Sequence, residues 1–278
     1  MVINKNIVLR GKIFDFSTPV VMAIINITPD SFYSKKGFET KAGLLKRVEK
    51  AVNDGAKIID IGGCSTRPNA EFVDEEEEIK RVVKALKIIR KNFPDVIISV
   101  DTFRANIAEM AVNQYQVDII NDISGGAIDK NMLPTIAKLN IPYILMHTRG
   151  TPQNMQQLTD YKDLIPDILK YFAEKIETLR YSGLTSDIIL DLGYGFAKTI
   201  EQNYELLTNQ KIFECFGLPI LTGISRKSMI NRVLGTTPEQ ALNGTSVLNT
   251  IALMNGANIL RVHDVKEAVQ TIKLVLNC

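Results

Sequence analysis

The sequence is poor in the residues from which disulfide frameworks and zinc sites are built. It has three cysteines and two histidines in 278 residues. Cys64, Cys215 and Cys278 are odd in number and far apart, so neither a disulfide framework nor a Cys-x-x-Cys metal site is available. His147 and His263 have no second histidine or cysteine at metal-ligand spacing, which argues against a zinc hydrolase.

The chain also lacks a strong charge of either sign and any long apolar run. Its net charge is +2, and no block of Lys and Arg with interleaved aromatics appears, so we expect no nucleic-acid partner. No apolar stretch approaches the roughly 20 residues that a membrane-spanning helix needs, so we expect no membrane association and a cytoplasmic location. The remaining composition, with 45% hydrophobic and 23% charged residues, is typical of a globular protein with a large core.

The most informative stretch is residues 58–68, where a short apolar run ends in a loop of small and polar residues. The run at 58–61 is too short for a helix and is typical of a strand buried on both faces, as in a parallel sheet. Two glycines then allow the backbone to turn, and Ser65, Thr66 and Arg67 offer hydroxyls and a guanidinium to a polar or anionic ligand. Alone, this is an ordinary strand-to-helix turn, but the pattern recurs along the chain.

An apolar strand, a polar strand end and a helix repeat eight times. The expected strands begin at residues 20, 58, 96, 118, 143, 188, 219 and 259. A (β/α)8 TIM barrel is the natural closure, because such barrels carry their active sites on the face where the strands end. We expect one domain, with residues 1–18 as a short N-terminal hairpin or cap and residues 19–278 as the barrel. A doubly wound open sheet is the alternative, but it would not place polar groups after every strand around one ring.

Buried carboxylates are a second unusual feature. Four aspartates lie within or directly after the apolar runs: Asp60, Asp101, Asp122 and Asp191. Ionised groups are costly there unless they are hydrogen-bonded or paired, and an amino-oxo heterocycle such as a pterin or guanine would supply the donors. Asn121 could add both a donor and an acceptor. The structural alternative for any single aspartate is a salt bridge to Arg67 or Lys227 inside the barrel mouth.

Two further motifs have ordinary explanations. The acidic tract at residues 74–78 begins a helix with one apolar side, and acidic residues in a first helical turn are explained by the macrodipole, so we expect no metal there. Residues 193–199 superficially resemble a phosphate-binding loop. Their spacing, however, fits neither the Walker A nor the dinucleotide-binding pattern, so no nucleotide-binding fold is expected.

Basic residues gather near the end of the last predicted strands. Arg261 and His263 are two residues apart on an extended segment and therefore share a face. Together with Lys227 they form a compact cationic group, for which a phosphate or a diphosphate is the expected partner.

Taken in order, these motifs resemble dihydropteroate synthase over residues 20–276. Because so many segments match in order, the resemblance is far more specific than any single motif. The matching segments are Asn26-Ile-Thr-Pro-Asp-Ser-Phe32, Ile59-Asp-Ile-Gly-Gly-x-Ser-Thr-Arg-Pro68, Ser99-Val-Asp-Thr102, Ile120-Asn-Asp122, Leu145-Met-His147, Asp191-x-Gly-x-Gly-Phe-x-Lys-Thr199, Ser225-Arg-Lys-Ser228 and Arg261-Val-His263.

The resemblance implies a Mg2+-dependent transferase of folate biosynthesis. Such an enzyme joins p-aminobenzoate to 6-hydroxymethyl-7,8-dihydropterin diphosphate, giving 7,8-dihydropteroate and diphosphate. The family is usually homodimeric, and sulfonamide drugs compete for the p-aminobenzoate position.

The resemblance also assigns site residues. The pterin would be held by Asp101, Asn121, Asp191 and Lys227. The diphosphate would be served by Asn26, Thr66, Arg261 and His263, with Asn26 also contacting Mg2+. The p-aminobenzoate would lie near Thr66, Arg67, Pro68, Phe196 and Ser228. The catalytic residues implied are Asp101, Lys227 and Arg67.

At three positions the chain departs from the usual family pattern. Ser34 stands where the first loop commonly has an acidic residue, Cys64 replaces a common Glu, and Leu192 replaces the proline of Asp-Pro-Gly. None of these changes removes a ring-binding group. One alternative is a pterin-binding methyltransferase domain, which would normally lack the loops at 65–68 and 225–228 together. Another is a non-catalytic pterin-binding paralogue, which only the altered first loop favours.

Overall fold

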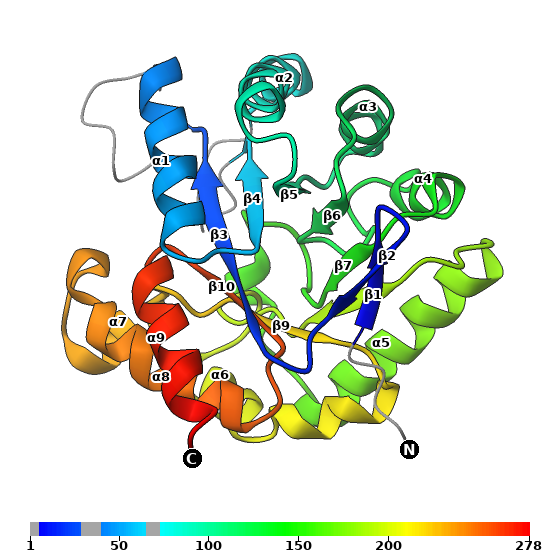
Figure 1. The fold of residues 1–278 in the computed structure, drawn as a ribbon. Coiled ribbons are helices and arrows are strands. Elements are labelled where there is room, and N and C mark those ends of the chain that lie inside the picture. The colour runs from blue at the N-terminus through cyan, green and yellow to red at the C-terminus, as the bar shows by residue number, and fades with distance from the viewer. Residues whose placement is uncertain (1–5, 29–39, 65–72) are drawn as a thin grey trace.

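The computed structural model describes residues 6–28, 40–64 and 73–278. Within these residues, eight parallel strands close into a barrel, in which β10 pairs with both β3 and β9 (Figure 1). The predicted (β/α)8 barrel is therefore confirmed, and the doubly wound sheet is excluded. The barrel strands are β3 (Val20–Asn26), β4 (Ile58–Gly62), β5 (Ile97–Asp101), β6 (Ile119–Asp122), β7 (Tyr143–Met146), β8 (Ile188–Asp191), β9 (Ile220–Thr222) and β10 (Ile259–Val262).

Helices connect the strands and surround the barrel (Figure 1). The α-helices are α1 (Lys41–Asn53), α2 (Glu75–Asn92), α3 (Ala105–Tyr115), α4 (Met132–Leu139), α5 (Leu164–Tyr181), α6 (Ile200–Thr208), α7 (Ser228–Leu234), α8 (Leu242–Met254) and α9 (Val265–Val275). The short helix α7 was not predicted, because seven residues show too little of the helical period. No helix in the described ranges is long and apolar enough to cross a membrane.

Local sequence explains where these elements begin. Every residue of β4 is buried, as expected for a strand between neighbours with helices outside. Thr40 and Asp74 cap α1 and α2 by accepting a hydrogen bond from a backbone N–H three residues later. Thr199 and Gln202 form a reciprocal capping box at the start of α6, which fixes the end of the loop that follows β8.

The predicted N-terminal hairpin is also present. Strands β1 (Asn6–Leu9) and β2 (Lys12–Asp15) pair in antiparallel fashion, and the turn residues Arg10 and Gly11 both have positive φ, as a tight hairpin turn requires. From this segment Ile7, Leu9 and Phe16 pack against inward-facing residues at the start of the barrel strands. The hairpin thus closes the end of the barrel where the strands begin.

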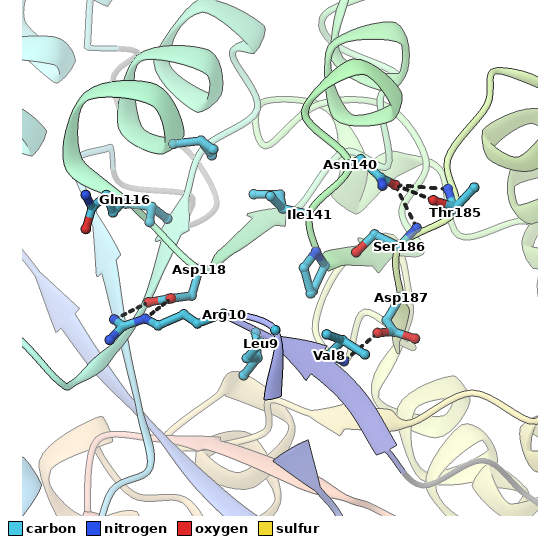
Figure 2. Close-up of a pocket in the computed structure, with 14 residues that line it drawn as sticks. Val8, Leu9, Arg10, Gln116, Asp118, Asn140, Ile141, Thr185, Ser186 and Asp187 are labelled. Carbon is cyan, nitrogen blue, oxygen red and sulfur yellow. Dashed lines mark hydrogen bonds and ion pairs between the residues drawn. The ribbon is translucent and has the colours of Figure 1, made fainter. Parts of the chain in front are cut away.

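A cavity of about 740 Å³ lies beside this hairpin (Figure 2). Arg10 donates to both carboxylate oxygens of Asp118, at 2.5 and 3.0 Å. Asn140 Oδ1 accepts hydrogen bonds from Thr185 and Ser186 (Figure 2). Since Asp118 and Asn140 come just before β6 and β7, the cavity lies at the opposite end of the barrel from the predicted active site.

Candidate active site

Charged side chains from several strands meet at the carboxyl end of the barrel. Arg261 of β10 donates from Nε to Asp60 at 2.7 Å and from Nη2 to Asp101 at 2.6 Å. Asp60 is fully buried and Asp101 is 6% exposed. Asn121 of β6 joins the same cluster through a 3.2 Å hydrogen bond from Nδ2 to Asp60. Four strands thus hold one network of two carboxylates, one guanidinium and one amide.

This network gives Arg261, one member of the predicted compact cationic group, two carboxylate partners. Burial alone would lower the pKa of Arg261. The charges of Asp60 and Asp101 outweigh this effect and raise the pKa of Arg261 above its ordinary value. Burial raises the pKa of Asp101 to about 7, although Arg261 beside it acts to lower it. The predicted salt-bridge alternative therefore holds for Asp60 and Asp101, with Arg261 as the partner instead of Lys227.

Three buried polar atoms near this network have no hydrogen-bond partner among the described residues. They are Asp60 Oδ1, Ser99 Oγ and Asn121 Oδ1. Asp60 lies opposite Ser99 in the pairing of β4 with β5, and Asp101 lies opposite Asn121 in the pairing of β5 with β6. Because buried polar groups in proteins are almost always satisfied, these atoms mark a place for a polar partner.

A second part of the site is built by the loops after β8 and β9. Asp191 Oδ1 accepts the N–H of Gly193 at 2.8 Å, and burial raises the pKa of Asp191 while Lys227 acts to lower it. Lys227 donates to the carbonyl of Tyr194 and lies 4.7 Å from the centroid of the Phe196 ring. Burial lowers the pKa of Lys227 to about 8, against the charge of Asp191. A carboxylate, an ammonium and an aromatic face are thereby brought together.

The structure places Asn26 near Asp101 as well. A Cβ atom added at Gly62 would lie 3.2 Å from Asn26 Oδ1 and 3.8 Å from the Cβ of Asp101. Glycine at this position therefore leaves the space in front of the Asn26 amide open. In the described ranges no group of three or more His, Cys, Asp or Glu could hold a metal, so the described residues alone do not complete a magnesium site at Asn26.

Two further predicted residues, His263 and Ser228, belong to the segments that follow β10 and β9. His263 Nδ1 is 3.1 Å from the hydroxyl of Ser225, which also accepts the backbone N–H of His263. Ser228 is exposed at the first position of α7, directly after Lys227. Four residues named from the sequence lie outside the described residues: Ser34, Thr66, Arg67 and Pro68. Their roles stay predictions.

Asp122 has a structural role. It is fully buried and accepts hydrogen bonds from the Tyr143 hydroxyl at 2.7 Å, from the backbone and hydroxyl of Ser124, and from the backbone of Gly126. The expectation that a heterocyclic ligand would satisfy this carboxylate is wrong, because its own loop and Tyr143 of β7 do so.

Glu78 does not follow the explanation given for the acidic tract. It is fully buried, pairs with Arg104 and accepts a 2.8 Å hydrogen bond from the Thr102 hydroxyl. Burial raises the pKa of Glu78, and both partners act to lower it. The signal was in the sequence, since Glu78 lies four residues before Val82 and therefore shares the apolar face of α2.

The sequence also gave no indication of a buried pair formed by Lys198 and His147. The Lys198 ammonium lies 3.1 Å from His147 Nδ1. The two residues are 51 positions apart and sit after different strands, so no periodicity or spacing could connect them. Lys198 belongs to the glycine-containing loop that did not fit any phosphate-binding pattern.

Comparison with known proteins agrees with this geometry. The family model described as "Pterin binding enzyme" matches residues 22–263. The dihydropteroate synthase of Synechocystis sp. is 43% identical over 256 residues, which cover 91% of this chain and 88% of that protein. The folic acid synthesis protein fol1 of Pneumocystis carinii is 42% identical over 278 residues, and this chain spans 37% of its length.

Solved structures give the same result. The dihydropteroate synthase of Yersinia pestis, in complex with a sulfonamide drug, superposes with a TM-score of 0.91 at 38% identity and covers 98% of both chains. The Clostridium difficile enzyme, in the presence of pteroic acid, superposes with a TM-score of 0.86 at 36% identity, covering 93% of this chain and 96% of that one.

Proposed function

The chain belongs to the family of pterin-binding enzymes and has the function of a dihydropteroate synthase, and we propose how the residues described above carry it. The reaction joins p-aminobenzoate to 6-hydroxymethyl-7,8-dihydropterin diphosphate and releases diphosphate. The observation that supports our assignment most strongly is the network of Asp60, Asp101, Asn121 and Arg261, because it offers hydrogen-bond acceptors to a donor-rich ring beside a cation.

The pterin ring would lie among Asp101, Asn121, Asp191 and Lys227. Asn121 Oδ1 is a buried acceptor without a partner among the described residues, and a pterin carries amino and ring N–H groups that would donate to it. Asp191 is positioned by the Gly193 N–H, which holds the carboxylate in one orientation. Carboxylates that accept hydrogen bonds from a buried ring form strong, charge-assisted contacts.

The diphosphate would be bound by Asn26, Arg261 and His263, together with Thr66. Arg261 Nη2 now donates to Asp101, and binding of pterin and diphosphate would let it turn toward phosphate oxygens while Nε keeps its bond to Asp60. The amide oxygen of Asn26 suits Mg2+, which takes few protein ligands and completes its shell with water and phosphate. When bound, Mg2+ would neutralise charge on the leaving diphosphate.

Transfer then separates charge within the site. The bond from the methylene carbon to the diphosphate oxygen breaks and the diphosphate keeps its electron pair, while the aromatic amine bonds to that carbon and passes its proton to water. Asp101 would stabilise the developing positive charge on the pterin, and Arg261 and His263 the leaving anion. Phe196, Ser228 and the loop with Thr66, Arg67 and Pro68 would position p-aminobenzoate, with Lys227 and Arg67 among the catalytic groups.

We further propose a cytoplasmic homodimer. Several large apolar side chains on α7 and α8 are at least one-third exposed: Val233, Leu234, Leu242, Val247 and Met254. Exposed apolar groups on neighbouring helices are typical of an interface between copies of one chain. Such a dimer would leave the strand ends free for substrates.

A binding experiment tests the assignment of the pterin site. In Asp191→Asn, an amide N–H would face ring donors, so we expect pterin affinity to fall by about 1–3 kcal/mol, or roughly 5- to 150-fold, in a calorimetric titration. The matched control is Asp118→Asn, since Asp118 is also a buried aspartate but pairs with Arg10 and Arg90 at the opposite end of the barrel. Equal affinities of both variants, each checked for folding, would remove Asp191 from the site.

A further inference from the structure

Lys198 is one of the most completely buried charged groups of the barrel. Its side chain is on the loop between β8 and α6, and the residue is 3% exposed. The ammonium has three acceptors within reach: the carbonyl of Gly193 at 2.9 Å, the carbonyl of Phe196 at 3.1 Å, and His147 Nδ1 at 3.1 Å. An ammonium has three N–H groups, so these acceptors match its donors one for one.

The same contact relates the charge of Lys198 to the tautomer of His147. When the ammonium donates to Nδ1, the neutral ring carries its proton on Nε2. Burial and the charge of Lys198 hold the pKa of His147 well below its usual range. Burial lowers the pKa of Lys198 to about 7, although the charge of Asp191 acts to raise it, so the pair carries a positive charge mainly below about pH 7.

The pair connects two loops of the proposed site. Lys198 binds both ends of the turn from Gly193 to Phe196, while His147 belongs to the loop after β7. Gly193 has φ of +71°, and a Cβ atom there would lie 1.9 Å from the carbonyl oxygen of His147. The loops therefore touch at Gly193, whose N–H also holds Asp191.

We propose that Lys198 and His147 are positioning residues for the pterin. In this inference, which rests on the function proposed above, the pair fixes the turn that presents Asp191 and Phe196. It also places a buried positive charge behind the Asp191 carboxylate, so that this carboxylate stays ionised when the ring covers it. Lys198 would not touch the substrate, and its effect would pass through Asp191.

Other groups also act on Asp191 and must be separated from this effect. Lys227, from the loop after β9, and Arg261 of β10 each favour the ionised form of Asp191. Tyr194 also lies close to Asp191. Burial is the main cause that raises the pKa of Tyr194, and the charge of Asp191 raises it further. His147 is neutral and adds no charge. Removing Lys198 leaves these groups in place, so its contribution should appear as a shift in pH dependence.

The first test is a pH series of pterin binding by Lys198→Met and the unmodified chain. Pterin affinity should be lost as pH falls through the pKa of Asp191, and loss of the Lys198 charge should raise that pKa. We expect Lys198→Met to bind about tenfold more weakly below about pH 7, where Lys198 is charged in the unmodified chain, and its profile to shift to higher pH. Lys175→Met is the control, because Lys175 is a partly buried lysine on a different segment, the helix α5. Its ammonium nitrogen lies 5.8 Å from the centroid of the Tyr171 ring.

The second test separates hydrogen bonding from ring packing. His147→Asn keeps an acceptor for the ammonium and should retain most of the pterin affinity, whereas His147→Leu should lose about tenfold. These two His147 variants test the positioning role of the pair even if Lys198→Met does not fold.

Two outcomes would overturn the inference: an equal loss for Lys198→Met at every pH, or equal effects of His147→Asn and His147→Leu. If the unmodified chain failed to bind pterin, the proposed function itself would fall.

Discussion

Removal of Arg261 should destabilise the protein in a way that depends on pH. The change Arg261→Met keeps much of the side-chain volume but leaves Asp60 and Asp101 without their cation. Both carboxylates are at least nine-tenths buried, so neither can be rescued by water without rearrangement. The protein must then either bury unpaired charge or protonate these groups.

The size of the effect follows from the burial of the pair. Removing one partner of a buried ion pair costs about 3–5 kcal/mol, which for a chain of this length is about 6–10 °C in Tm. The pKa of Asp101 is already about 7 beside Arg261, and without this cation it should rise further. A carboxyl whose folded-state pKa lies above its unfolded value loses stability as pH rises between the two. The loss of unfolding free energy in Arg261→Met should therefore be largest above about pH 8. It should shrink to about 1–2 kcal/mol near pH 5, where mainly the hydrogen bonds of Arg261 are lost.

Urea unfolding at about pH 5 and about pH 8.5 measures this difference. The double variant Asp60→Asn with Arg261→Met should recover part of the loss at high pH, because one orphaned carboxylate is gone. Lys138→Met serves as the control, since its pair with Glu109 is exposed and should contribute less than about 1 kcal/mol at either pH. An Arg261→Met penalty that was equal at both pH values would refute the reasoning.

Three other predictions concern the hairpin, the metal and the dimer. Phe16→Ala should lower the unfolding free energy by about 3–5 kcal/mol, because the ring is fully buried at the closed end of the barrel, and should leave KM for both substrates unchanged in steady-state assays. Chelation of divalent ions should weaken binding of the pterin diphosphate far more than binding of the bare hydroxymethyl pterin, as measured by calorimetry; equal effects would argue against a Mg2+ ion on the diphosphate. Leu234→Glu should shift the protein from dimer to monomer in analytical ultracentrifugation, whereas the exposed hairpin variant Ile13→Glu should not.

The fold could be predicted because its signals are local and repeated. Buried runs such as 58–61 and 143–146 each lie within a strand, and the turn at Arg10 and Gly11 closes the expected hairpin. The short helix α7 was missed because seven residues carry too little periodicity. Helix α6 ends at Thr208 and the chain continues as a 3-10 helix, Gln210–Phe216, a change of hydrogen-bond pattern that apolar spacing does not reveal.

The site could be predicted only in part, because strand ends are local while side-chain pairing is not. The position of Asp101, Asn121, Asp191 and Lys227 at one end of the barrel follows from strand order alone. Arg261 and Asp60 form a pair although they are 201 positions apart in the sequence, and this pairing depends on closure of the barrel. Satisfaction of Asp122 by its own loop, like the bond between Lys198 and His147, likewise depends on backbone geometry that sequence spacing does not specify.

The most direct test of the central claim is a transfer assay with the unmodified chain, Mg2+, 6-hydroxymethyl-7,8-dihydropterin diphosphate and p-aminobenzoate. We predict that 7,8-dihydropteroate and diphosphate form in equal amounts, and that a sulfonamide raises the apparent KM for p-aminobenzoate without changing kcat. Tight binding of the pterin diphosphate with no dihydropteroate formed would contradict the account and identify a pterin-binding protein without transferase activity.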